Sequence, residues 1–145
     1  MNVYARPLQP AVDRSLLVLP SLPLIAASLS GVAAAIHAWV VPEHLEEWWG
    51  YGTFFLVLTV AQALYAVLLL RSQRPVLLIA GIVGTVATLG LYAWSRLVAV
   101  PFGPMAGEVE EVGRIDMVGN LAEIALVAVL LVLLVRALTA RRGKA

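Results

Sequence analysis

The chain has 145 residues and a formal net charge of +1, and 61% of its residues are hydrophobic whereas only 13% are charged. Soluble domains carry about a quarter charged residues, so this composition excludes an ordinary soluble domain. The absence of cysteine excludes disulfides, thiolate metal sites and thiol nucleophiles. The sequence also lacks the basic stripe that is typical of nucleic-acid-binding proteins, so we expect no nucleic-acid partner.

The apolar residues form four long blocks, which predict membrane spans at about 16–41, 52–70, 76–100 and 117–138. Each block can cross roughly 30 Å of hydrocarbon at about 1.5 Å per residue. The length of the first block favours a retained span over a cleaved signal peptide. Because short loops favour antiparallel neighbours, we predict an all-α fold, a single-domain integral membrane four-helix bundle with up-down-up-down topology.

The positions of lysine and arginine predict how the bundle is oriented. Eight of the ten lie in the two tails, at the end of the fourth span or in the 71–75 loop, whereas Arg96 and Arg114 lie on the other side. By the positive-inside rule, both termini are expected to be cytoplasmic in the plasma membrane. The acidic segments 42–50 and 101–114 are then the outer loops. The lipid bilayer is the expected partner, with a homo-oligomer or a larger membrane complex as further options.

The stretch from His37 to Trp49 concentrates most of the unusual chemistry of the chain. It contains both histidines, three glutamates and three of the four tryptophans. Pro42 is expected to end the first helix within this stretch, because proline lacks the N–H group of a helix interior. The aromatic residues of this region predict a belt at the outer membrane interface, formed by Trp39, Trp48, Trp49, Tyr51 and Trp94.

The fourth span carries a carboxylate into the membrane. A span that ends near Arg136 must begin near Met117, so Glu123 falls inside the hydrocarbon zone. An acid facing lipid at that depth costs a few kcal/mol or more, so Glu123 is expected to point into the bundle and to find a partner. Asp116 and Asn120 precede it on the same helix face, at spacings of i, i+4 and i+7.

These positions predict a polar pocket in the outer half of the bundle. Its expected lining residues come from the first, third and fourth spans, and Gln62 of the second span is placed deeper. The complete set of predicted ligand-binding residues is His37, His44, Glu47, Gln62, Arg96, Asp116, Asn120 and Glu123. The alternative is that Arg96 and an acid of the fourth span form an interhelical ion pair that only fixes the packing of the helices.

A metal site is a narrower hypothesis for the same region. The two imidazoles of His37 and His44 with the carboxylates of Glu47 and Glu123 would suit a divalent transition metal such as zinc, iron or copper. Haem held by the two histidines is an alternative. The interruption expected at Pro42 argues against both, because the histidines need not then share a helix face.

Two weaker patterns concern packing. Small residues four apart, which let helix backbones approach closely, predict contact faces along 27–35 and 80–88. The segment from His37 to Pro42 also parallels the segment from Arg96 to Pro101, and a Glu-Glu pair follows each. This repeat predicts two similar hairpins, with His37 and Arg96 at matching depths.

The segments PEHLEEWWGYGTFF and SRLVAVPFGPMAGEVEEVGRIDMVGN resemble those of small four-span membrane proteins of actinobacteria and related thermophilic bacteria. The resemblance covers nearly the whole chain after about Ser15. The size and the number of spans are also similar to those of the DoxX-like four-helix proteins. The resemblance implies a fold and a membrane location, and it implies no catalytic residues.

Three function classes follow from these observations. The first is a binding or sensing module whose outward-facing pocket holds a metal ion or a small polar ligand. The second is an accessory or scaffold subunit whose polar residues only lock the helices together. The third is a membrane oxidoreductase or proton-coupled enzyme that uses His37 as a proton carrier and Glu123 as an acid or base.

Overall fold

The computed structural model describes residues 21–142, which form four helices joined by short turns and one longer connection. The helices are α1 (Ser21–Glu47), α2 (Trp49–Arg71), α3 (Pro75–Leu97) and α4 (Arg114–Arg142). This architecture confirms the prediction of an all-α four-helix bundle. All four helices are long and apolar enough to cross a membrane, as expected for a multi-pass membrane protein.

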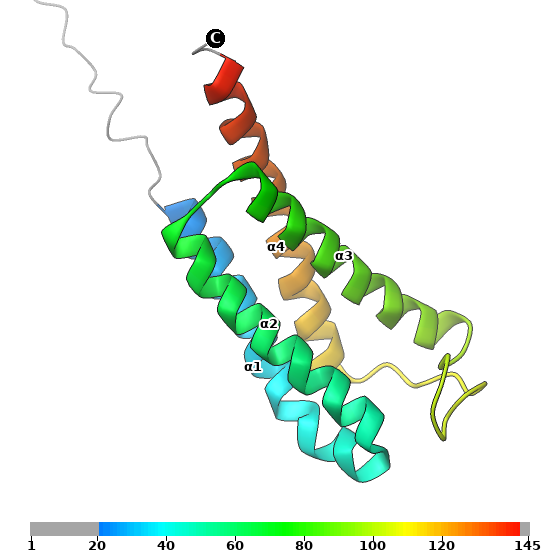
Figure 1. Ribbon diagram of the computed structural model, residues 1–145. Helices are drawn as coiled ribbons and strands as arrows, with labels where there is room; N and C mark the ends of the chain where they lie inside the picture. Colours follow the sequence, from blue (N-terminus) through cyan, green and yellow to red (C-terminus); the bar gives the residue numbers. More distant parts are fainter. Residues whose placement is uncertain (1–20, 143–145) are drawn as a thin grey trace, which may run out of the picture.

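The helices run alternately up and down, so the chain connections are sorted between the two ends of the bundle (Figure 1). The turn between α1 and α2 and the 98–113 connection lie at one end, and the turn between α2 and α3 lies at the other. Helix α1 packs against α2 and α4, and α3 packs against α4, whereas α2 and α3 are not packed along their lengths. The bundle is therefore open between α2 and α3.

The outer surface of the bundle is apolar. Exposed large hydrophobic side chains occur on all four helices, for example Leu24, Val57, Val83 and Leu121. A soluble protein could not expose such a continuous apolar surface without aggregating, whereas in lipid these side chains meet acyl chains. Burial and hydropathy thus agree with a lipid bilayer as the solvent of the bundle.

The prediction that Pro42 ends the first helix is wrong. Helix α1 contains Pro42 and continues to Glu47, and the Trp48 N–H group still donates to the His44 carbonyl at 3.0 Å. A proline removes one helical hydrogen bond, whereas a helix end leaves four carbonyl groups to be satisfied. Continuing the helix is therefore the less costly choice, and the α1–α2 connection shrinks to a tight turn at Trp48.

The other span limits are close to those predicted. Helix α3 ends at Leu97 instead of residue 100, and α4 begins at Arg114, three residues earlier than predicted. The 98–113 connection turns at Gly103 and Gly107, whose φ angles of 92° and 89° favour glycine. The predicted start of the first span, residues 16–20, lies outside the described residues.

The small-residue face predicted on α1 is buried only in part, at Ala27, and the face predicted on α3 is wrong. On α1 the fully buried face carries Ala26, Ser30 and Ala33, whereas Ala35 of the predicted face is exposed. On α3 the predicted Gly84 is likewise exposed. Spacing alone fixes which residues share a face, and it leaves open which face meets a neighbour. Near the turn between α2 and α3, large side chains form the core, namely Leu69, Leu78, Leu126 and Leu130.

The difference between the buried and the exposed face of α1 gives a stability prediction with a control on the same helix. Ala33 is 0% exposed, so Ala33→Leu should overpack the helix contact and lower the free energy of unfolding by about 1–3 kcal/mol. Ala35→Leu adds the same atoms on an exposed face and should change it by less than about 0.5 kcal/mol. Unfolding in mixed micelles by added SDS measures both values. Equal costs for the two variants would contradict the burial of Ala33 between helices.

Candidate functional site

Glu123 of α4 is the buried acid of the bundle, with 2% of its side chain exposed. Its Oε1 atom accepts a hydrogen bond from Gln62 Nε2 of α2 at 2.7 Å. The same oxygen lies 3.3 Å from His37 Nε2 of α1. One carboxylate oxygen thus joins three helices. This confirms the inference that the acid points inward and meets partners from the other spans.

The helix pair that supplies these partners is itself fixed at the same level. Ser30 Oγ of α1 donates to the backbone carbonyl of Gln62 at 2.8 Å, and both residues are buried. This bond ties α1 to α2 at the position from which the Gln62 amide reaches Glu123. The depth of the Gln62 side chain is therefore set by the backbone and not by the acid alone.

The two histidines share an aromatic neighbour. Phe55 of α2 stacks against His37, with ring centroids 5.7 Å apart, and is tilted against His44 at 4.3 Å. His44 Nδ1 donates to the Val40 carbonyl of its own helix at 2.8 Å, which leaves Nε2 to act as an acceptor. Both imidazoles therefore lie on the face of α1 that is turned toward α2.

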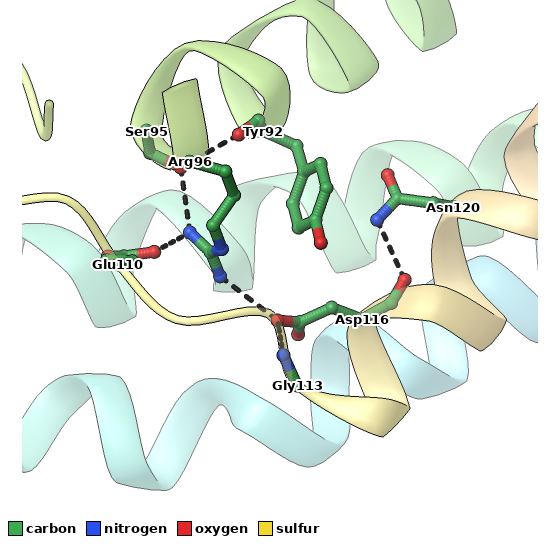
Figure 2. A network of polar contacts seen from close by, with 7 residues as sticks. All are labelled: Tyr92, Ser95, Arg96, Glu110, Gly113, Asp116 and Asn120. Carbon is green, nitrogen blue, oxygen red and sulfur yellow. Dashed lines mark hydrogen bonds and ion pairs between the residues drawn. The ribbon is translucent and has the colours of Figure 1, made fainter. Parts of the chain in front are cut away.

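A second polar cluster lies nearer the long connection and centres on Arg96 at the end of α3 (Figure 2). Its guanidinium group donates to the carboxylates of Glu110 and Asp116, the latter at 3.0 Å. Asp116 also accepts the Gly113 N–H group at 3.1 Å, at the start of α4. An acid in the first turn stabilises a helix, so the cluster fixes the connection, the start of α4 and the end of α3 together.

Tyr92, one turn before Arg96, completes this cluster. The guanidinium carbon of Arg96 lies 4.7 Å from the centre of the Tyr92 ring, within the range of a cation–π contact. Figure 2 shows the ring beside the guanidinium group, with the Asn120 side chain beyond it. Asn120 Nδ2 donates to the Asp116 carbonyl of its own helix at 2.8 Å.

A cavity of about 390 Å³ connects the two clusters. It is lined by all four helices and by the 98–113 connection, and it lies toward the end of the bundle that holds this connection. Glu123 and His37 line its inner part, and Arg96 and Asp116 line the part near the connection. This volume falls within the range of small-molecule sites, which are concave and mostly apolar with a few polar groups.

Aromatic side chains dominate the remaining wall, on the side of the α1–α2 turn. They are Trp48, Trp49, Tyr51, Phe54, Phe55 and Phe102. Tyr51 ties this wall to the connection, because its hydroxyl donates to the Phe102 carbonyl at 2.7 Å and accepts the Met105 N–H group at 3.3 Å. The tether holds the connection over the α1–α2 end of the cavity.

The structure brings most of the predicted site residues together. Six of the eight line the cavity, namely His37, His44, Arg96, Asp116, Asn120 and Glu123. Gln62 reaches the site through its bond to Glu123. Glu47 is exposed at the end of α1 and is not among the lining residues.

The predicted metal ligands His37, His44, Glu47 and Glu123 do not converge. Within residues 21–142, no three histidine, aspartate or glutamate side chains are arranged to hold an ion. The two imidazoles instead pack against the Phe55 ring, and Glu47 is exposed at the end of α1.

The repeat also fails to place His37 and Arg96 at matching depths. On α4, His37 contacts Glu123 whereas Arg96 contacts Asp116, seven residues earlier. The two contacts are therefore about 10 Å apart along α4. The difference arises because α1 continues for ten residues after His37, whereas α3 ends one residue after Arg96.

Sequence reasoning missed three contributors to the site. Glu110 is one of several acids in the connection, and the charge pattern does not single it out as the partner of Arg96. Phe55 is an ordinary apolar residue of a span, and Ser30 an ordinary small one. Their roles depend on which faces of α1 and α2 meet, and sequence spacing does not give that information.

No protein-family model, curated protein or solved structure matches the chain. The cavity and its lining residues are therefore the basis for assigning a function.

The bonds of Glu123 predict how substitutions affect stability. Glu123→Leu leaves the Gln62 amide and His37 without their shared acceptor, so it should lower the free energy of unfolding by about 1–3 kcal/mol. Glu123→Gln keeps an oxygen acceptor and should cost less than about 1 kcal/mol. The free energy of unfolding of each variant is measured in mixed micelles and compared with that of the wild type. Equal costs would show that hydrogen bonding at Glu123 does not hold the helices together.

Proposed function

We propose that the protein is a small multi-pass binding protein of the plasma membrane, and that its outward-facing pocket holds a small ligand with a polar group and an apolar body. The observation that carries this proposal is the cavity of about 390 Å³ that extends from the buried Glu123 carboxylate to the Arg96 cluster. A bundle whose polar residues served only to lock helices would have no need of such a space, because membrane helices gain stability from close packing.

The chemistry of Glu123 supports a ligand in this cavity. Within residues 21–142, the bond from Gln62 and the contact with His37 both involve Oε1, so Oε2 has no partner in this part of the chain. A carboxylate oxygen beneath the membrane surface is costly unless something donates to it. A ligand donor that enters the cavity would satisfy it.

The positive-inside rule supports an outward-facing pocket. The pocket lies at the end of the bundle that holds the α1–α2 turn and the 98–113 connection, where acidic residues gather. The basic residues Arg71, Arg74, Arg141 and Arg142 lie at the opposite end of the bundle. That basic end is expected to face the cytoplasm.

A scaffold role is the competing account, and the Arg96 cluster is the observation that favours it. Arg96 joins α3 to α4 and to the connection through two carboxylates, as a purely structural clamp would. The clamp also forms part of the cavity wall, so it is compatible with both accounts. The two accounts differ in whether a ligand occupies the cavity.

A cavity-filling variant tests this difference. Asn120 lines the cavity, and its side-chain bond among residues 21–142 is to a carbonyl of its own helix, so Asn120→Phe should occupy cavity space with little loss of stability. Leu121→Phe is the matched control, because Leu121 is 69% exposed on the next position of α4. The thermal unfolding of both variants and of the wild type is measured in detergent with benzylamine, benzyl alcohol and phenylacetate.

At least one of these compounds should raise the melting temperature of the wild type and of Leu121→Phe, because a ligand that binds only the folded state stabilises it. The increase should be lost in Asn120→Phe. If a compound raises the melting temperature of all three proteins equally, or if none raises any, the cavity is not a binding site and the scaffold account stands.

A further inference from the structure

We propose that the pocket selects organic cations that carry an aromatic or alkyl body. This inference rests on the proposed function, and it specifies the class of ligand. Three features of the cavity lead to it, namely the balance of charge in the lining, the way in which Arg96 is already occupied, and the aromatic wall.

The lining holds three carboxylate side chains and one guanidinium group. Its carboxylates belong to Glu110, Asp116 and Glu123, and its guanidinium group belongs to Arg96. Charges in a low-dielectric site act strongly on one another, so an excess of carboxylates attracts a cation and repels an anion.

Arg96 offsets only one of the three carboxylate charges, and it is already paired with two of those acids. Its two terminal nitrogens donate to Glu110 and Asp116, and one of them also donates to Ser95. The remaining nitrogen, Nε, is fully buried and has no partner among residues 21–142. Both terminal nitrogens of Arg96 are therefore already engaged by carboxylates.

The aromatic wall provides the second half of the recognition. The faces of tryptophan, tyrosine and phenylalanine attract cations, and the attraction strengthens where water is excluded. Trp48 packs edge-on against Tyr51 with ring centroids 5.0 Å apart, so neighbouring rings of the wall are set at different angles. The Arg96–Tyr92 contact shows that the pocket already holds one cation against a ring.

The geometry then suggests where each part of a ligand would lie. The cationic group would lie between the aromatic wall and the carboxylates, where Glu123 Oε2 lacks a protein partner in the described part of the chain. The apolar body would fill the opening between α2 and α3, which is lined there by Phe54, Thr88 and Leu91. This arrangement matches a small amphipathic amine or quaternary ammonium compound.

The test compares three compounds of nearly equal shape that differ in charge. Benzyltrimethylammonium is the cation, neopentylbenzene is its uncharged isostere with carbon in place of nitrogen, and phenylmethanesulfonate is the anion. Binding of each to the full chain in lipid nanodiscs is measured by equilibrium titration at one ionic strength, because salt screens charges. Asn120→Phe and Leu121→Phe again provide the filled cavity and its control.

The cation should bind at least about tenfold more tightly than its neutral isostere, and the sulfonate should bind more weakly than both. Glu123→Gln should reduce the affinity for the cation and leave that for the isostere nearly unchanged. Glu110 lies outside the helices, and Glu110→Gln should also reduce the affinity for the cation, though by less. This variant tests the proposal even if Glu123→Gln does not fold.

Two results would overturn the proposal in different ways. If the isostere or the sulfonate binds as tightly as the cation, and Asn120→Phe abolishes that binding, the pocket is real but does not select cations. If no compound distinguishes Asn120→Phe from Leu121→Phe, binding reflects the lipid alone, and the proposed function fails together with this inference.

Discussion

The bundle depends on a single carboxylate oxygen, Glu123 Oε1, which receives the Gln62 amide and approaches His37. The fourth span cannot reach across a membrane without this acid, because the apolar run that follows it is too short. Lipid offers no hydrogen bonds, so the acid can be accommodated only inside the protein. The positions of α1 and α2 against α4 follow from that constraint, and the cavity lies directly beside it.

The Arg96 cluster fixes the part of the cavity wall that lies near the 98–113 connection. It holds α3 against α4 and fixes the connection that covers the site, so α3 need not pack along α2. The space between these two helices is consequently not closed by helix packing. Tyr51 maintains the same arrangement from the α2 side, through its bonds to the connection.

The sequence predicted the fold and much of the site for one physical reason. Long apolar blocks and the cost of a charge in lipid are strong, local signals, and they placed four helices and turned Glu123 inward. The prediction failed where the answer depended on contacts between helices. Pro42 was expected to end α1, and the choice of contact face was wrong on α3 and only partly right on α1. The predicted metal ligands also do not come together, because Phe55 packs against both histidines and Glu47 is exposed.

The most direct measurement is a double-mutant cycle between Gln62 and Glu123, with leucine at either position and at both, followed by unfolding in mixed micelles. Because the two side chains share a buried hydrogen bond, the cycle should give a coupling free energy of roughly 0.6–1.7 kcal/mol. Effects that add to within about 0.3 kcal/mol would show that the two residues do not interact, and would contradict the role of Glu123 as the acid that joins the helices.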